Sequence, residues 1–301
     1  MGDTRFTPLI DSMVWSYSRI KAFEDCRYRW FLKYVQPKLL IDKVFGGERP
    51  TRVDVDLAYI RSELDVNDVC VLSEYLGFNR KDLFFANYGT FMHKLIEQYL
   101  KGEKLSSQLV DGYLENFKSE VKGKAPNRKV FANYFKNGLE YLKEIKPFPY
   151  KILDVEKRVD LKIEGLPFCG YIDIVGEKDG TLHVIDNKSR LLKPRSNRTK
   201  PTKADIELDF YLRQLYLYSV AVEEQYGALP KALCFNCFRN NLWIEEPFNE
   251  KAYAESQKWF LDSVAEIREE DNFNPSPEFF KCTYLCEMQD CCGYYELMQK
   301  R

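Results

Sequence analysis

The spacing of hydrophobic residues divides the chain into a helical first half and a second half that contains strands. Before Pro147, apolar side chains recur every three or four positions, as on the buried face of an amphipathic helix. This spacing predicts helices at 16–35, 88–101, 106–122 and 129–145. The segment 37–54 contains two prolines and two glycines among charged residues, so it is expected to be a loop that leads into less regular helices up to about residue 77.

After Pro149 the pattern changes to short apolar segments typical of strands. Asp179-Gly180 lies between two of these segments and is typical of a tight hairpin turn. The order of elements predicts an α/β fold, with a mixed sheet flanked by helices. Strands are expected at 151–163, 168–176, 181–188, 231–238 and 241–247, and helices at about 205–226 and 250–270. We expect one body over 1–301, with a mainly helical part at 16–147, a core at 148–272 and a cysteine-rich end at 273–301.

Composition is that of a soluble, folded protein. Hydrophobic residues make up 45% of the chain and charged residues 30%, and the formal net charge is −1. Because this balance gives no overall field that attracts nucleic acid, an anionic ligand must be bound by a local group of Lys and Arg. The N-terminus lacks the basic and apolar regions of a secretion signal, and no apolar run is long enough to span a bilayer. These features predict an intracellular, cytoplasmic protein with no membrane partner.

Charged residues interrupt the apolar runs of the second and third expected strands. Asp186 and Lys188 are two residues apart and share one face of their strand. A solvated edge strand or a cross-strand ion pair would explain these two residues alone. The hairpin can also place Asp173 opposite them, and two close carboxylates are stabilised by a divalent cation with oxygen ligands. We therefore expect Asp173 and Asp186 to bind Mg²⁺ or Mn²⁺, with the backbone carbonyl of Asn187 as a third ligand and Lys188 stabilising charge on a phosphoryl oxygen.

The distribution of the nine cysteines indicates a metal site near the end of the chain. Cys282, Cys286, Cys291 and Cys292 lie within eleven residues. In a reducing compartment the cysteines are poor candidates for disulfides and remain free to bind metals. Four thiolates can hold zinc or a [4Fe–4S] cluster, and spacing alone does not distinguish the two. Reduced, unligated cysteines in a loop are the third alternative.

Six segments together resemble the RecB-like branch of the PD-(D/E)XK nucleases. They occur along most of the chain in the order SYSRIKAFEDCRYRWFLKY, GTFMHKLIE, GYIDIV, VIDNKS, QLYLY and the cysteine tail. This branch includes the nuclease domains of bacterial recombination complexes, among them the AddB type, and the stand-alone nuclease of CRISPR adaptation. The resemblance implies a restriction-endonuclease-like fold and metal-dependent cleavage of DNA.

The resemblance also implies roles for the residues of the hairpin and its surroundings. Asp173 and Asp186 would be the central metal ligands, His93 an additional ligand and Lys188 the catalytic lysine. Glu156 matches a position that is often acidic in the family. Without the resemblance, His93 would be interpreted as a partly buried histidine whose hydrogen bonds are satisfied.

Gln214 and Tyr218 lie one turn apart on an expected helix and share a face. Their spacing alone favours a core stripe. The resemblance implies that they position the substrate or the active-site strand.

For the cysteines, the resemblance implies a [4Fe–4S] cluster that joins Cys26 near the N-terminus to Cys282, Cys286 and Cys292 in the tail. Such a cluster would clasp the two ends of the nuclease body together. This tail differs from the usual pattern of the family, because three residues rather than two separate Cys282 from Cys286, and Cys291 adjoins Cys292.

Segment 188–204 contains seven Lys or Arg residues and no acidic residue. Its prolines and small polar residues favour a loop, and it starts at the lysine of the expected metal site, so we expect it to contact phosphate. The combined interpretation is a metal-dependent DNA nuclease, an exonuclease acting on single strands or duplex ends, with a helicase or recombination factor as a protein partner. The alternative is a DNA-binding or assembly subunit that has the nuclease fold but does not cleave.

Overall fold

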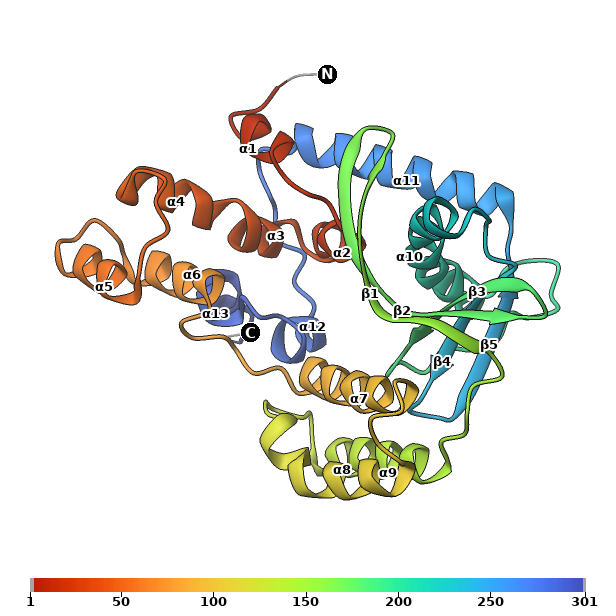
Figure 1. Cartoon of the computed structure of the whole chain (residues 1–301). Helices are drawn as coiled ribbons and strands as arrows, with labels where there is room; N and C mark the ends of the chain where they lie inside the picture. The colour runs from red at the N-terminus through yellow and green to blue at the C-terminus, as the bar shows by residue number, and fades with distance from the viewer. Residues whose placement is uncertain (1–2, 300–301) are drawn as a thin grey trace.

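The structure, a computed structural model, describes residues 3–299 of the 301-residue chain. A five-stranded mixed sheet forms its centre, with helices on both sides and an N-terminal part built of helices (Figure 1). The α/β class and the mixed sheet expected from the sequence are confirmed. The strands are β1 (Lys151–Ile163), β2 (Leu166–Lys178), β3 (Thr181–Asn187), β4 (Ala232–Cys237) and β5 (Leu242–Pro247).

The strands lie side by side in the order β1-β2-β3-β4-β5. β1, β2 and β3 pair antiparallel, β4 runs parallel to β3, and β5 is antiparallel to β4. Because parallel neighbours need a long crossover, the chain passes through α10 (Lys203–Tyr226) between β3 and β4. Asp179 and Gly180 have φ angles of 51° and 71° and form the turn that the Asp-Gly pair predicts.

The two faces of the sheet pack against different helices (Figure 1). α10 and α11 (Glu250–Glu269) lie together against one face and share the largest apolar cluster with it. α7 (Phe84–Leu100) lies on the other side, with α8 (Ser106–Glu120) and α9 (Arg128–Glu144) packed against it around buried aromatic rings. This arrangement leaves α7 and α10 on either side of the end of β3, where the charged residues of the hairpin lie.

The segment 16–35 is not a single helix. α2 (Tyr17–Asp25) ends and α3 (Arg27–Tyr34) begins at Cys26, whose backbone is extended (φ −165°, ψ 110°). Ile20 on α2 and Trp30 on α3 are both fully buried. Because the apolar faces of both helices meet the core, the hydrophobic pattern continues across the break and conceals it.

The prediction of a loop at 37–54 is also wrong for the first part of this segment, which lies in α4 (Gln36–Phe45). Pro37 lies in the first turn, where a backbone N–H has no helical partner to lose, and Gly46 ends the helix in the left-handed conformation (φ 62°). The proline and glycine therefore mark the two ends of a helix. The helices before and after it are α1 (Thr7–Asp11), α5 (Arg52–Ile60) and α6 (Val66–Leu76).

The C-terminal tail packs back onto α3 and α6. It contains α12 (Phe279–Tyr284), a 3₁₀ turn η1 (Gln289–Cys291) and α13 (Gly293–Gln299). Glu287 lies 2.9 Å from Arg29 Nη2 and 2.6 Å from Lys33 Nζ, so an ion triad joins the tail to α3. Cys291 forms a disulfide with Cys70 on α6, which corrects the expectation that the cysteines do not pair.

Within residues 3–299, no helix combines the length and apolar character needed to cross a bilayer.

Candidate active site

Two aspartates lie where β2 and β3 separate. The last pair of their ladder is Ile174 with Ile185, and the next residues in this register are Asp173 and Asp186. Asp173 Oδ2 accepts a hydrogen bond of 2.7 Å from the backbone N–H of Asn187. The hairpin thus brings the two expected carboxylates together at the end of the ladder.

Asp186 is a buried carboxylate whose Oδ2 still has a lone pair that can bind a cation. The residue is only 3% exposed, and its Oδ2 forms a charge-assisted contact of 2.7 Å with Lys188 Nζ, with no further hydrogen-bond donor beside it among the described residues. Buried carboxylate oxygens normally have hydrogen-bond partners or bind a cation. Asp186 Oδ2 is therefore suited to a metal ion.

His93 on α7 and Glu156 on β1 complete a cluster with Asp173. His93 Nδ1 lies 3.5 Å from Asp173 Oδ2 and 3.9 Å from Glu156 Oε1, and the ligand atoms of the three residues lie within 4.8 Å of one another. His93 Nε2 is hydrogen-bonded to the backbone carbonyl of Asn187 at 2.8 Å, so the carbonyl expected as a metal ligand faces the histidine ring.

Glu156 has an unusual backbone for a strand residue. Its φ angle is 51°, in the left-handed region that costs a non-glycine residue on the order of 1 kcal/mol. It lies between Val155 and Lys157, which pair with Ile174 and Ile172 on either side of Asp173. This local twist of β1 occurs at the residue whose carboxylate reaches His93.

Neighbouring charges shift the pKa values of this cluster strongly. Burial and the charge of Asp186 raise the pKa of Asp173 to about 7, against the opposing effects of His93, the Asn187 N–H and Lys188. Burial lowers the pKa of His93, but the nearby Glu156 carboxylate and the charges of Asp173 and Asp186 outweigh it and raise the pKa to about 9. The cluster therefore holds protons that a bound cation would displace, as expected for close acidic groups without a metal.

Lys188 is held by a chain of polar contacts from α10. Its Nζ donates a 3.1 Å hydrogen bond to Gln214 Oε1, and Gln214 Nε2 donates in turn to the hydroxyl of Tyr218 at 3.1 Å. The ring of Tyr211 lies 5.4 Å from the same Nζ. Burial lowers the pKa of Lys188, but the charges of Asp186 and Asp173 raise it above its ordinary value, so the amine stays protonated.

The sequence interpretation missed two residues that shape the site. A side chain on Gly170 would place its Cβ 2.5 Å from the Tyr218 ring, so only glycine admits this ring. Asn236 on β4 is buried; its Nδ2 donates to the side-chain oxygen of Asn187 at 2.7 Å, and its carbonyl accepts from the Lys188 N–H at 2.9 Å. A glycine inside a strand and an asparagine inside an apolar run are signals that could have identified both.

The donor set suits a hard divalent cation. Asp173, Asp186 and Glu156 supply carboxylate oxygens, and His93 supplies an imidazole that Mn²⁺-type sites accept. A cation among them would relieve the repulsion between Asp173 and Asp186 that raises the pKa of Asp173. The residues present therefore fit a metal-dependent hydrolytic site.

The four cysteines assigned to the clasp line one cavity of about 310 Å³. Cys26 lies at the break between α2 and α3, and Cys282, Cys286 and Cys292 come from the tail. Burial raises the pKa of Cys292, and Cys26 and Cys282 are near enough to raise it further. Cys291 does not line this cavity, because it pairs with Cys70.

The spacing of these sulfurs bears on which metal they could hold. A single tetrahedral zinc with Zn–S bonds of about 2.3 Å needs sulfurs roughly 4 Å apart. Among the described residues, the cysteine sulfurs form no group of three within 4.8 Å. In any three of these sulfurs, at least one pair is therefore farther apart than the ligands of one bound zinc ion.

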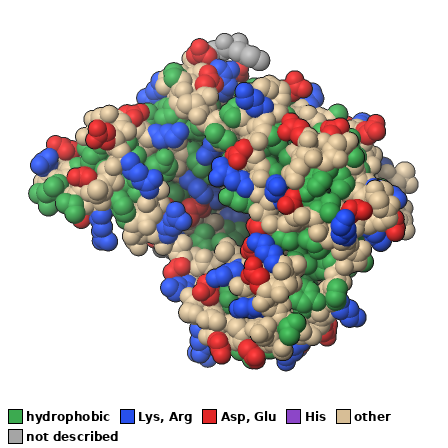
Figure 2. Space-filling view, in the orientation of Figure 1, with side chains coloured by type: hydrophobic (Ala, Val, Ile, Leu, Met, Phe, Trp, Pro, Cys, Tyr) green, Lys and Arg blue, Asp and Glu red, His purple; other side chains and the backbone are tan. Residues whose placement is uncertain are grey.

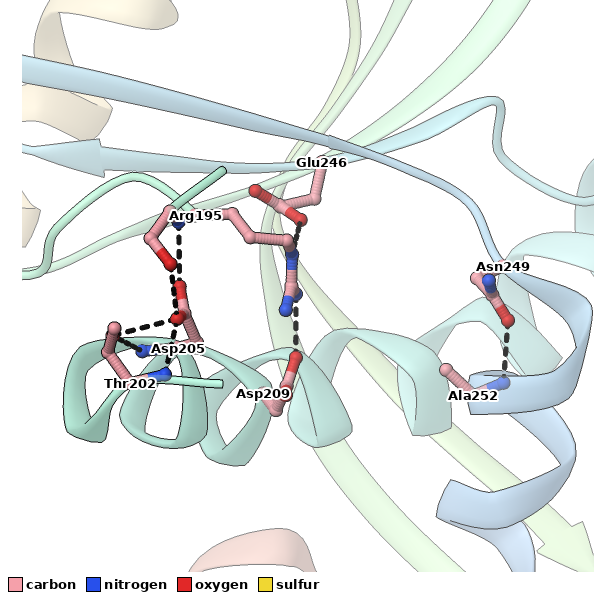
Figure 3. A network of polar contacts seen from close by, with 8 residues as sticks. Arg195, Thr202, Asp205, Asp209, Glu246, Asn249 and Ala252 are labelled. Carbon is pink, nitrogen blue, oxygen red and sulfur yellow. Dashed lines mark hydrogen bonds and ion pairs between the residues drawn. The ribbon is translucent and has the colours of Figure 1, made fainter. Parts of the chain in front are cut away.

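The basic segment 188–204 forms a loop, as expected, and acidic residues hold part of it in place (Figure 3). Arg195 pairs at 2.6 Å with both Asp209 and Glu246. Asp205, at the start of α10, accepts hydrogen bonds from Ser196 and Thr202. Among the described residues of this segment, four cations have no ion pair and are exposed: Lys193, Arg198 and Lys200 in the loop, and Lys203 at the first position of α10.

A mixed sheet with an Asp-x-Lys strand beside a second aspartate defines a nuclease-type hydrolytic site. The model of the PD-(D/E)XK nuclease superfamily matches residues 71–293, which is more than half of the chain. The chain therefore belongs to the PD-(D/E)XK nuclease superfamily, a class of metal-dependent nucleases. No curated protein matches the sequence.

Proposed function

We propose that this nuclease is a Mg²⁺- or Mn²⁺-dependent DNA exonuclease of the RecB-like branch. The observation that carries the proposal is the convergence of Asp173, Asp186 and Lys188 at the end of the β2–β3 ladder, with His93 and Glu156 beside them. A protein that only binds DNA has no use for buried carboxylates beside phosphate, because they repel it.

In this proposal His93, Glu156, Asp173 and Asp186 hold the divalent cation. When bound, the cation supplies Lewis-acid stabilisation of phosphoryl oxygens and lowers the pKa of a water molecule. Lys188 keeps its proton and places a positive charge beside Asp186, where it stabilises the charge that develops on the phosphoryl group. Gln214 and Tyr218 are positioning residues, because they act through the ammonium group of Lys188.

DNA would approach through the hollow seen between the N-terminal helices and the body of the sheet (Figure 2). Lys and Arg side chains gather in this hollow, and the cavity beside the cysteines is lined by Lys21, Arg29, Arg190 and Lys281. Tyr211 lies both in that cavity and 5.4 Å from the Lys188 ammonium. Its ring offers a surface on which a base can stack next to the catalytic lysine.

For the tail we propose that Cys26, Cys282, Cys286 and Cys292 hold a [4Fe–4S] cluster with a structural role. All four line the same cavity, and the ion triad of Arg29, Lys33 and Glu287 already aligns the tail with α3. The cluster would join elements 256 residues apart in sequence (282 − 26) and so restrict the unfolded chain.

Substrates with and without free ends test the proposed exonuclease activity. With Mg²⁺ or Mn²⁺, the protein should degrade linear single-stranded or duplex DNA and leave covalently closed circles intact, as followed on gels with labelled DNA. Linear DNA with both ends blocked by hairpins is the matched control and should also survive. Cutting of circles would show an endonuclease, and binding without any degradation would support the non-cleaving alternative.

A further inference from the structure

The chain contains two histidines. The second one, His183, lies in a cluster that does not include Asp173. His183 on β3, Cys234 on β4 and Glu245 on β5 place their ligand atoms within 4.8 Å of one another. His183 is 3% exposed and Cys234 fully buried, while Glu245 lies at the surface. None of these residues belongs to the nuclease site or to the cysteine clasp.

The sheet register explains why the three side chains meet. Cys234 pairs with Ile185 on one side and with Glu245 on the other, and His183 lies two residues before Ile185. All three side chains therefore project from the same face of three neighbouring strands. This face is opposite to the one that carries Asp186, so the cluster is separate from the cation site.

The hydrogen bonds of His183 leave one ring nitrogen free to bind a metal. The hydroxyl of Thr181 donates to the carbonyl of Lys178 at 2.8 Å, so toward His183 Nε2, 3.3 Å away, it can only accept. Nε2 must then carry the ring proton, and Nδ1 has a bare lone pair. Nδ1 is buried and has no hydrogen-bond partner among the described residues.

Tyr150 closes the cluster on its remaining side. Its hydroxyl lies 3.0 Å from Glu245 Oε2 and 3.7 Å from Cys234 Sγ, and its ring centroid is 4.9 Å from that of His183. Ile174, Ile185 and Ala232 pack around the cluster, and Lys178 Nζ lies 5.7 Å from the Tyr150 ring. His183 is a buried imidazole whose Nε2 is held by a hydrogen bond, and it lies beside a thiol and a carboxylate. This is the ligand arrangement of protein zinc sites.

We propose that His183 Nδ1, Cys234 Sγ and a Glu245 carboxylate oxygen form a zinc site that joins β3, β4 and β5. The hydroxyl of Tyr150 or a water molecule completes the tetrahedron. The role of the site is structural, because it ties the edge strand β5 to the two strands next to it.

Cobalt binding tests this site without relying on nuclease activity. Co²⁺ added anaerobically to the full-length protein should produce a thiolate-to-cobalt charge-transfer band that saturates at one equivalent, and Zn²⁺ should abolish the band. Co²⁺ bound at the carboxylate site near Asp173 gives no such band, because that site has no thiolate. Any band from Co²⁺ at the clasp cysteines is the same in Cys234→Ala, so the band of this site is read as the difference between the unmodified protein and Cys234→Ala. The band should disappear in Cys234→Ala, and His183→Gln and Glu245→Gln should weaken cobalt binding at least about tenfold.

Cys237→Ala is the matched control, because Cys237 is a buried cysteine on the same strand whose side chain projects from the other face. It should keep the band. Glu245→Gln should fold normally, since residue 245 is exposed and glutamine can still bond to Tyr150, and its nuclease rate should equal that of the unmodified protein. Absence of the band in the unmodified protein, or its persistence in Cys234→Ala, would overturn the proposal whether or not the protein cleaves DNA.

Discussion

Lys188→Ala should lower the rate of DNA cleavage by at least about 10²-fold, the usual effect of removing one group that stabilises transition-state charge. The Lys188 ammonium is fixed between Asp186 and Gln214 and faces the rings of Tyr211 and Phe235. No other Lys or Arg among the described residues forms an ion pair with Asp186. The rate is measured at saturating Mg²⁺ or Mn²⁺ with end-labelled DNA.

Lys162→Ala is the control for this substitution, because Lys162 is an exposed lysine on β1 and should leave the rate unchanged. Mn²⁺ binding by Lys188→Ala should persist, since Asp173, Glu156 and His93 remain, and circular dichroism checks its fold. A rate within a few-fold of the unmodified protein would show that Lys188 has no role in catalysis.

Cys26→Ser should remove most of the iron from protein purified anaerobically. It should also lower the free energy of unfolding by about 2–4 kcal/mol, because a clip that closes so long a loop restricts the unfolded chain. The loss of unfolding free energy stays in this range, because the ion triad at Glu287 and the Cys70–Cys291 disulfide still connect the tail to the N-terminal helices. Elemental analysis and denaturant unfolding measure the two effects.

Cys169→Ser provides the comparison for the clasp, because Cys169 is a partly buried cysteine on β2 that does not line the cavity. Its iron content and stability should match those of the unmodified protein. Equal iron in Cys26→Ser would exclude Cys26 as a ligand, and an unmodified protein without iron would exclude the cluster.

The nuclease core could be predicted closely because its signals are local. Asp179-Gly180 specifies a turn with two positive φ angles, and the alternation on either side of it sets the register of β2 and β3. From that register, the proximity of Asp173 and Asp186 follows. The family model agrees with this interpretation at the level of the superfamily, and the RecB-like branch stays a prediction.

The helical part was harder to predict because proline and glycine occur both in loops and at the ends of helices. Pro37 and Gly46 are typical of a loop in the sequence, but in the structure they mark the start and end of α4. The break at Cys26 has no signal in the hydrophobic pattern, since α2 and α3 both turn apolar faces to the core. The extended residue between the two helices can be located only once the packing of both helices is known.

Contacts between residues far apart in the sequence could not be predicted either. The position of Glu156 beside His93 depends on a left-handed residue in β1, and nothing in the sequence near Glu156 indicates it. The disulfide between Cys70 and Cys291 joins residues 221 positions apart. The cluster of His183, Cys234 and Glu245 likewise needs the order of three strands, of which two pair in parallel through the α10 crossover.

The central claim is that one divalent cation binds among His93, Glu156, Asp173 and Asp186 beside the Lys188 ammonium. Anomalous scattering from a crystal of the protein soaked in Mn²⁺ tests it most directly. The account predicts a manganese peak within bonding distance of the Asp173 and Asp186 carboxylates, and the loss of this peak in Asp173→Asn. Manganese found only at other positions, with no peak between these two carboxylates, would contradict it.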